Sequence, residues 1–503
     1  MIKDMVFVTP ESEGLSSENI LKFLKIVDDE KLNLHSFALA RHGKILAEGY
    51  FKPFDKDFRH RIYSCSKSFT ALAVGKLIAD GYVKITDKII DYFPEYLNCA
   101  ADEAIKNVTI EDCLTMRVGI LPTSYHERDD IKYLPLEKDW AKSFFARYKS
   151  KKPNGIGFDY NTSASYILAV LVEKLTGQTF LHYLNPVFEK IGVATDLECV
   201  QSPDGYSHGG SGVLITLRDY LKVSELIMHK GESAGEQLLP RDYMENATAN
   251  LVDTIIDGAC AYDCRGYGYQ IWQTGFGFGM YGMGGQLSFM CPDKDFIFVC
   301  NADMQCSTGG FGDKMRNIVK YLFYDNLQDL PLKENKPAYS LLNDKLSNLE
   351  LINGYGKTYS PVIGKINGVK YVCAENEANI SDFTLMFNGD EGELKFTKDG
   401  VQKAIKFGME KFVKFPFPET KYYGMKIGFP ANRGFDTFAS AAFISDKFLL
   451  IRAYIADVCF GHLGITVEFN GGENTAVLKL VKTAEYFLYD YKGLITAKRS
   501  DKQ

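Results

Sequence analysis

The chain has 503 residues, which is too long for one ordinary hydrophobic core, so we expect at least two domains. Hydrophobic residues make up 46% of the sequence and charged residues 24%, a balance that is typical of soluble globular proteins. The net charge of −6 leaves no basic excess of the kind that binds nucleic acid, so we expect no nucleic-acid partner.

The amino-terminal residues lack the apolar core of a signal peptide. No stretch approaches about 18 uninterrupted apolar residues, so we expect neither a membrane-spanning helix nor a membrane partner. The 11 cysteines are odd in number, irregularly spaced and without a C-x-x-C pair, which favours reduced thiols over a disulfide framework or a zinc site. We therefore expect a cytoplasmic protein with no metal and no other cofactor.

Strand pairs stand near the start and near the end of the first 328 residues, with helices between them. Apolar runs that flank a turn predict hairpins, and apolar residues at helical spacing predict helices. These segments are a hairpin at 36–49, helices at 66–80, 163–175 and 215–230, a hairpin at 287–300 and a helix at 313–327. The pattern indicates an α+β domain whose sheet is assembled from both ends of the segment.

The character of the sequence changes near residue 329. Residues 329–348 are polar and mixed, and we interpret them as a linker. From residue 349 onward, short alternating runs are separated by Asn, Gly and Asp turns, which predicts a small antiparallel β domain. We therefore expect an α+β domain over residues 1–328, the linker, and a β-rich domain over residues 349–503.

Ser64 and Lys67 form the only Ser-x-x-Lys pattern in the chain. Residues three apart lie on one face of a helix, close enough for a hydrogen bond. A serine hydroxyl is a weak nucleophile that needs an adjacent base, and a lysine can serve once burial lowers its pKa. The motif opens a strongly apolar helix, so we expect Lys67 to enter a core. Ser66 and Ser68 are sequence neighbours of Lys67 and should point elsewhere, so the geometry favours Ser64.

A second candidate serine, Ser207, lies in the G-x-S-x-G pattern of residues 205–209. In α/β-hydrolases this pattern follows a buried strand and precedes a helix, and neither is expected here. The chain order that such a triad requires leaves only His229 and His462 downstream, and neither belongs to a motif. We interpret Ser207 as a loop residue.

Tyr160 stands before the helix predicted at 163–175 and is followed by Asn161 and Thr162. A tyrosine in this position is most often a packing residue with a tethered hydroxyl. Beside a Ser–Lys pair the same hydroxyl can carry a proton. The residues alone leave both interpretations of Tyr160 open.

Ser64–Lys67, Tyr160–Thr162 and Gly282–Gln286 occur in the order and relative spacing of the penicillin-recognising serine hydrolases. The chain resembles this family over roughly residues 7–325, in the branch of class C β-lactamases, serine D-Ala-D-Ala peptidases and related esterases. Stretches such as GKILAEGYF and GYGYQIW also look like that family. The resemblance implies an antiparallel sheet flanked by helices, a helical subdomain beside it, and a site between the two.

The resemblance also implies a role for each motif. Ser64 is implied as the nucleophile, Lys67 as its activating partner and Tyr160 as the second general acid or base. Which of Lys67 and Tyr160 takes the proton is left open, so we treat them as a pair. The backbone N–H groups of Ser64 and Gln286 are implied as the oxyanion hole.

Two residues depart from the family pattern, and both bear on substrate choice. Thr162 stands where the family usually has an asparagine that binds the substrate amide, and a hydroxyl cannot present both an amide N–H and a carbonyl. Met283 stands where a lysine or histidine usually helps to bind a substrate carboxylate. Gly284 and Gly285 keep the oxyanion strand intact, because that role uses backbone. The departures imply retained acyl transfer with a weakened preference for β-lactams.

We therefore expect a serine hydrolase that works through an acyl-enzyme on a small ester or amide, with that small molecule as its partner. One alternative is a β-lactamase or D-Ala-D-Ala peptidase proper. Another is a non-catalytic binding protein on the same scaffold, which Thr162 and Met283 favour. The oligomeric state and the role of the β-rich domain stay open.

Overall fold

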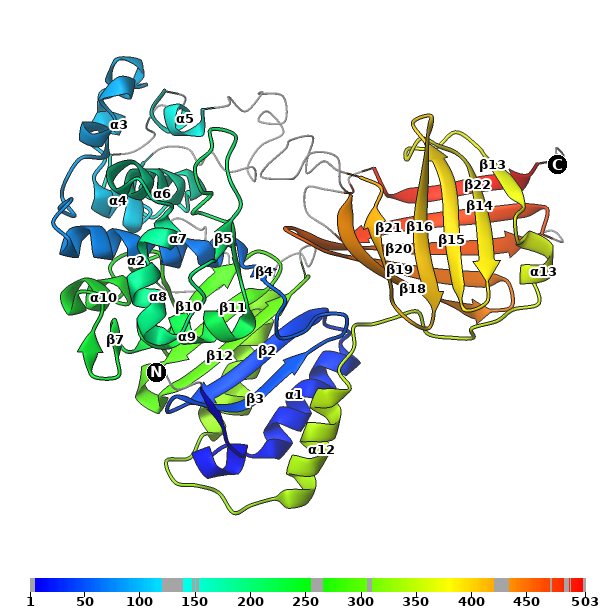
Figure 1. Cartoon of the computed structure of the whole chain (residues 1–503), viewed down its shortest axis with the longest axis horizontal. Coiled ribbons are helices and arrows are strands. Elements are labelled where there is room, and N and C mark those ends of the chain that lie inside the picture. The colour runs from blue at the N-terminus through cyan, green and yellow to red at the C-terminus, as the bar shows by residue number, and fades with distance from the viewer. Residues whose placement is uncertain are drawn as a thin grey trace. The chain divides into compact units, whose positions relative to one another are not determined.

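The computed structural model describes residues 5–119, 139–146, 150, 153–254, 266–304, 310–419, 434–470, 473–483, 488 and 490–500. The chain divides into two compact units, which Figure 1 shows in ribbon form. The first unit comprises Met1–Tyr50, Phe54–Ala302 and Ser307–Leu349. The second comprises Phe51–Pro53, Asp303–Cys306 and Glu350–Gln503.

The first unit is built on a seven-stranded sheet with the order β1-β3-β2-β12-β11-β10-β9. Its neighbours are antiparallel except for β1 and β3. Strands from the beginning and the end of the unit thus meet in one sheet, which confirms the predicted α+β class. The strands are β1 Val6–Phe7, β2 Leu34–Arg41, β3 Lys44–Tyr50, β9 Trp272–Gln273, β10 Phe278–Gly282, β11 Gln286–Cys291 and β12 Phe296–Ala302.

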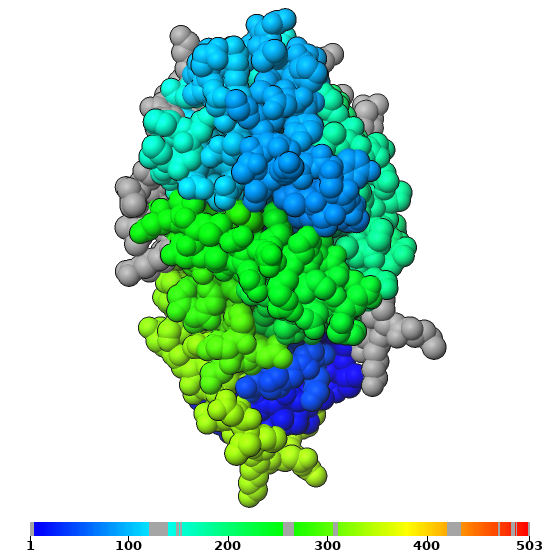
Figure 2. All heavy atoms as spheres, turned by 90° about the vertical axis from the view of Figure 1, so that its left-hand side faces the viewer, coloured from blue at the N-terminus to red at the C-terminus, as the bar shows by residue number. Residues whose placement is uncertain are grey.

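Helices flank this sheet and also gather beside it, where α6 packs against α2, α4 and α5. Figure 2 shows one face of the unit, where the green segment that carries α10 lies between the light-blue segment above it and the dark-blue amino-terminal segment below it. The helices are α1 Ser17–Asp29, α2 Ser66–Ala79, α3 Glu103–Lys106, α4 Ile110–Leu114, α5 Trp140–Ala146, α6 Thr162–Thr176, α7 Phe180–Tyr183, α8 Asn185–Ile191, α9 Leu217–Met228, α10 Arg241–Ala247, α11 Phe311–Ile318 and α12 Lys336–Ser347.

The two faces of the sheet are covered by different helices, because successive strand residues point to opposite faces. On one face, the ring of Phe23 from α1 lies 5.9 Å from the ring of Phe298 in β12. On the other, the Ser224 hydroxyl of α9 lies 2.8 Å from the Ser288 hydroxyl of β11. The sheet is therefore buried on both sides, with α9 on the face opposite α1.

Local sequence signals set the ends of α6. The Asn161 side chain accepts a hydrogen bond from the Ser163 N–H at 2.9 Å, which satisfies one of the free donors of the first turn. Gly177 ends the helix with a φ of 69°, in the left-handed region that favours glycine. Tyr160 is thereby held immediately before a buried helix.

The segment interpreted as a linker, residues 329–348, contains a folded element. Helix α12 packs along α1, and the Lys345 ammonium bonds the Asp28 carboxylate at 3.0 Å. Its Leu342 is fully buried. The helix begins at a local signal, because the Asn335 side chain accepts from the Ala338 N–H. Residues 336–347 are therefore part of the first unit rather than a free connection.

The second unit is a ten-stranded sheet with the order β16-β15-β14-β13-β22-β21-β20-β19-β18-β17. A further pairing of β16 with β18 closes the sheet toward a barrel, which agrees with the expected antiparallel β domain. The strands are β13 Lys370–Cys373, β14 Ile380–Asn388, β15 Glu391–Lys398, β16 Val401–Met409, β17 Val413–Phe417, β18 Phe435–Ser445, β19 Phe448–Ala456, β20 Phe460–Asn470, β21 Thr475–Thr483 and β22 Gly493–Arg499; a short helix, α13, spans Ile363–Ile366. Among the helices that the structure describes, none is both long and apolar enough to cross a membrane.

Candidate active site

Ser64 lies in a short 3₁₀ turn, Tyr63–Cys65, that leads directly into α2. Tyr63 has a φ of 44°, a left-handed conformation that a bulky residue rarely adopts. The guanidinium of Arg61 lies 4.5 Å from the centre of the Tyr63 ring and holds this residue from one side. The strained residue therefore lies immediately before the predicted nucleophile, where backbone strain commonly accompanies function.

Lys67 faces Ser64, as the spacing of the two residues predicts. Its ammonium donates to the Ser64 hydroxyl oxygen at 3.0 Å and to the Gly210 carbonyl at 2.7 Å. The side chain is 1% exposed, and this burial lowers the pKa of Lys67 to about 7. A lysine with such a pKa is neutral in a substantial fraction of the molecules near pH 7, so it can act as a base toward Ser64.

The two neighbouring serines point away from this pair, as predicted. The Ser66 hydroxyl accepts from the Val213 N–H at 3.0 Å, which joins the start of α2 to the strand β6 (Val213–Ile215). The Ser68 hydroxyl donates to the Gln270 carbonyl at 2.7 Å. Both hydroxyls therefore anchor α2 and contact neither Ser64 nor Lys67.

The ring of Tyr160 also lies near the lysine. The Lys67 ammonium lies 4.8 Å from the centre of this ring, a cation–π distance. The ring stacks on Trp272 at 5.5 Å, which fixes its plane. The structure thus brings Ser64, Lys67 and Tyr160 together, although they lie in two separate segments of the chain.

Gly210 is a site residue that we did not predict. A side-chain carbon at this position would lie 2.7 Å from the Thr162 methyl group, so only glycine fits between α6 and Lys67. Its neighbour Gly209 is equally confined, and the Thr70 hydroxyl donates to the Gly209 carbonyl at 2.9 Å. The sequence signal was the adjacent glycine pair, and Thr162 lies beside the segment that it forms.

The turn between β10 and β11 contains the glycines expected to shape the oxyanion strand. Gly284 and Gly285 have φ values of 79° and 96°. A side-chain carbon on Gly285 would lie 2.3 Å from the Phe311 ring, so this position excludes any other residue without movement. Met283 is half-buried in the same turn.

Gln286 is fixed by its side chain as well as by the strand. The side-chain amide donates to the carbonyls of Met283 at 3.0 Å and Ala302 at 2.8 Å, and its oxygen accepts from the Ala302 N–H at 3.2 Å. The Cys65 thiol donates to the Gln286 backbone oxygen at 3.2 Å. The backbone of Gln286 therefore lies beside the residue that follows Ser64. From the sequence we assigned Gln286 a backbone role only. We missed its side-chain hydrogen bonds to Met283 and Ala302, called the Gln286 clamp below, and the contact with Cys65.

Ser207 is a loop residue, as we interpreted it. Its side chain is 2% exposed, and its N–H donates to the Glu173 carboxylate at 3.3 Å. Within the described residues, its one β-pairing is an isolated bridge with Gln201. A serine enclosed in this way does not meet a substrate, so the geometry leaves Ser64 as the candidate nucleophile.

The sequence model of the beta-lactamase family matches residues 35–303 of this chain. The match spans more than half of the chain, which therefore belongs to that family and to the wider superfamily of penicillin-recognising serine hydrolases.

Individual relatives come from several organisms. The 6-aminohexanoate-dimer hydrolase of Paenarthrobacter ureafaciens is 24% identical over 282 residues, which cover 52% of this chain and 71% of the relative. The structure of an octameric penicillin-binding protein homologue from Pyrococcus abyssi covers 96% of this chain and 99% of its own, with 14% identity and a TM-score of 0.48. A penicillin-binding protein homologue from Caulobacter crescentus covers 62% and 97%, with 18% identity and a TM-score of 0.49.

Proposed function

We propose that this member of the beta-lactamase family is a serine hydrolase that acts through an acyl-enzyme on a small ester or amide. The observation that carries the proposal is the 3.0 Å contact between the Lys67 amine and the Ser64 hydroxyl, in a site that buries the lysine. Burial supplies a base near neutral pH, and adjacency lets that base activate the serine.

In the proposed first step, Ser64 Oγ attacks the substrate carbonyl carbon while neutral Lys67 takes the hydroxyl proton. The Gly210 carbonyl, 2.7 Å from the amine, favours the protonated lysine that results. The proton then passes to the leaving alcohol or amine, with Tyr160 as the second member of the shuttle. Water attacks the ester of Ser64 in the second step, with the same pair as base, and releases the acid.

The negative oxygen of the tetrahedral intermediate is proposed to lie between the backbone N–H groups of Ser64 and Gln286. The Cys65–Gln286 hydrogen bond supports this assignment, because it ties the segment of one donor to the residue of the other. The Gln286 side-chain clamp supports it further, since preorganised donors stabilise charge without reorganisation.

Substrate choice is proposed to follow from Met283 and Thr162. Neither side chain carries a charge, so a substrate carboxylate gains no ion pair from either residue. Neutral or weakly anionic esters and amides are therefore proposed ahead of penicillins and peptide carboxyl termini. We also propose a cytoplasmic location, on the strength of the reduced thiols that the cysteine spacing favours, and a small-molecule partner.

A substrate panel tests the proposal. We expect p-nitrophenyl acetate or a small anilide to be hydrolysed faster than nitrocefin, and Ser64→Ala to abolish turnover without loss of fold. The dimer of 6-aminohexanoate belongs in the panel because of the relative named above. Turnover that survives Ser64→Ala would exclude the mechanism, and preferred nitrocefin hydrolysis would favour a β-lactamase. A folded protein that turns over none of these compounds would favour a binding protein on this scaffold.

A further inference from the structure

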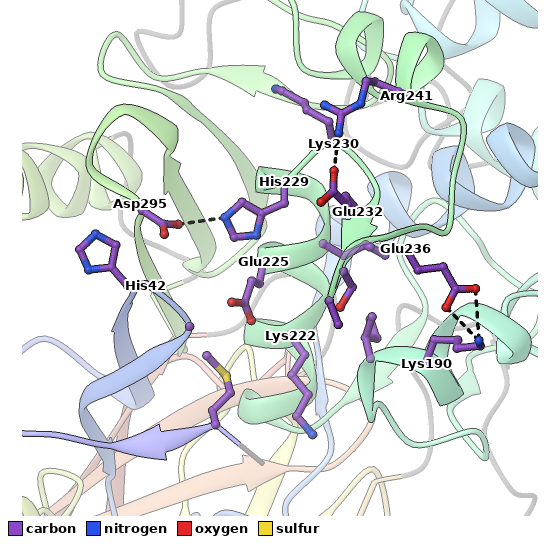
Figure 3. A pocket seen from close by; sticks show the side chains of 16 residues that line it. His42, Lys190, Lys222, Glu225, His229, Lys230, Glu232, Glu236, Arg241 and Asp295 are labelled. Carbon is purple, nitrogen blue, oxygen red and sulfur yellow. Dashed lines mark hydrogen bonds and ion pairs between the residues drawn. The ribbon is translucent and has the colours of Figure 1, made fainter. Parts of the chain in front are cut away.

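A cavity lies in the first unit, at the carboxyl end of α9 (Figure 3). Its volume is about 1050 Å³, which is ample for a small organic molecule. Its walls come from α9, the end of α8, the hairpin of β7 (Glu232–Ser233) and β8 (Glu236–Gln237), and the turns at residues 42–43 and 295. Ser64, Lys67 and Gln286 are not among its lining residues, so it is distinct from the candidate active site.

Most of the charges around this cavity are already matched to one another. The ammonium of Lys190 lies 2.9 Å from the Glu236 carboxylate, and Arg241 lies 2.5 Å from Glu232. His229 lies 3.0 Å from Asp295. Figure 3 shows these three contacts as dashed lines, and each one pairs two side chains that both line the cavity.

The remaining two lysines of the wall are also engaged. Lys222 donates to the Gly192 carbonyl and lies 3.9 Å from the Asp219 carboxylate, and Lys230 donates to the Thr248 hydroxyl. The Lys230 ammonium also lies 4.3 Å from the centre of the Phe278 ring. Both ammonium groups are therefore held by the protein itself.

Glu225 is different, because no hydrogen bond or ion pair from the part of the chain that the structure describes reaches its carboxylate. The side chain is half-buried on α9, and burial raises the pKa of Glu225. A side-chain carbon on Gly43 would lie 3.1 Å from one of its oxygens, so glycine keeps that approach open. His229 and Asp295 are its charged neighbours, and they act on Glu225 in opposite directions. A partly desolvated carboxylate without a hydrogen bond or ion pair is costly, and a cation that enters the cavity would relieve the cost.

We propose that this cavity binds a small alkylammonium ion, with the charged end on Glu225 and the carbon chain on Met5 and Ile191. The ammonium group would form a charge-assisted hydrogen bond with the carboxylate. Met5, which is half-buried, and Ile191 line the same cavity and offer the chain its apolar contacts. The proposal is independent of the hydrolytic function, because it uses none of the residues of that site.

Isothermal titration calorimetry of the whole 503-residue chain with hexylammonium tests the proposal. We expect saturable binding that Glu225→Gln weakens at least tenfold and that Glu225→Asp, which keeps the charge, largely retains. Glu189→Gln is the matched control, because Glu189 is an exposed carboxylate on α8 outside the lining and its loss should leave the dissociation constant unchanged.

Two further ligands separate the contribution of the positive charge to binding from that of the carbon chain. Hexanoate has the same chain with the opposite charge and should not bind, and 1-hexanol should bind at least tenfold more weakly than hexylammonium. Equal affinity of the wild type and Glu225→Gln for hexylammonium would overturn the proposal. So would equal affinity for hexanol, or no saturable binding of hexylammonium at millimolar concentration. Circular dichroism of each variant confirms that the protein compared is folded.

Discussion

The thiol of Cys65 donates a hydrogen bond to the backbone oxygen of Gln286 at 3.2 Å, in the buried interior of the first unit. Burial raises the pKa of this thiol to about 12, so it stays protonated and remains a donor. The residue after Ser64 is thus joined to the residue proposed to supply the second oxyanion donor. The contact ties together two segments that are 221 positions apart in sequence.

Replacing the thiol should loosen this arrangement. We expect Cys65→Ala to lower kcat by about tenfold with little change in KM, because a displaced donor weakens binding of the transition state more than of the substrate. Cys65→Ser, which restores a donor, should recover most of the loss. Steady-state kinetics on an ester substrate measures both, and an equal loss in the two variants would show that packing, not the hydrogen bond, matters.

The pH dependence of the reaction should report Lys67. Its amine must be neutral to accept the Ser64 proton, and its pKa is lowered by burial to about 7. We therefore expect kcat/KM to rise with pH through about 7 and to fall about tenfold per unit on the acid side. Lys67→Arg stays protonated throughout and should lose at least about a hundredfold in kcat/KM. A rate that does not change between pH 5 and 8 would remove Lys67 from the role of base.

The Gly284–Gly285 turn should tolerate no side chain at its second position. We expect Gly285→Ala to lower kcat more than about tenfold and to destabilise the first unit by about 2 kcal/mol, because the new carbon meets Phe311 and the φ is strained. Gly275→Ala is the matched control, since Gly275 has a φ of 88° but open space around it. Similar losses of activity in the two variants would show that backbone strain alone is responsible.

Acid should destabilise the first unit through a buried histidine pair. His35 Nδ1 lies 2.9 Å from His60 Nε2, and burial lowers the pKa of His60 to about 3. Because this folded-state pKa lies below the unfolded value of about 6.5, the unfolded chain binds more protons between the two. The contribution is present above about pH 6.5 and is lost as the pH falls, by about 2 kcal/mol between pH 6.5 and 5.

Urea unfolding at pH 7 and pH 5 measures this effect. His60→Gln keeps a donor and an acceptor but does not titrate, so its unfolding free energy should fall less than that of the wild type over the same interval. An identical fall in both proteins would place the acid sensitivity elsewhere.

Substrate preference should change when the missing cation is supplied. We expect Met283→Lys to raise kcat/KM for nitrocefin about tenfold or more, because a carboxylate then gains a charge-assisted hydrogen bond. Hydrolysis of the neutral p-nitrophenyl acetate should change little. A matching increase for both substrates would mean that Met283 acts through the shape of the turn rather than through charge.

Much of this architecture could be predicted because it depends on local patterns. The hairpins that build the sheet have apolar runs on both sides of a turn, and Ser64 and Lys67 need only a three-residue spacing to meet. The folded part of the segment 329–348 was missed because α12 buries little, and Leu342 is its one fully buried residue. A polar helix with so narrow an apolar stripe resembles a linker.

The parts of the site that sequence reasoning missed depend on contacts across long separations. The Gly210 carbonyl accepts a hydrogen bond from Lys67, which lies 143 positions away in sequence. No local sequence pattern predicts that a backbone oxygen will bind the lysine. The Gln286 clamp on Ala302 is likewise a tertiary contact, visible only once β11 and β12 are paired. Side-chain chemistry was therefore easier to predict than the backbone groups that orient it.

Ser64 is proposed to be a nucleophile that its surroundings activate, and intact-mass analysis after treatment with a fluorophosphonate tests this role most directly. We expect one covalent adduct on the wild type and on Ser207→Ala, and none on Ser64→Ala. No adduct on the folded wild type, or an adduct that disappears only in Ser207→Ala, would contradict it.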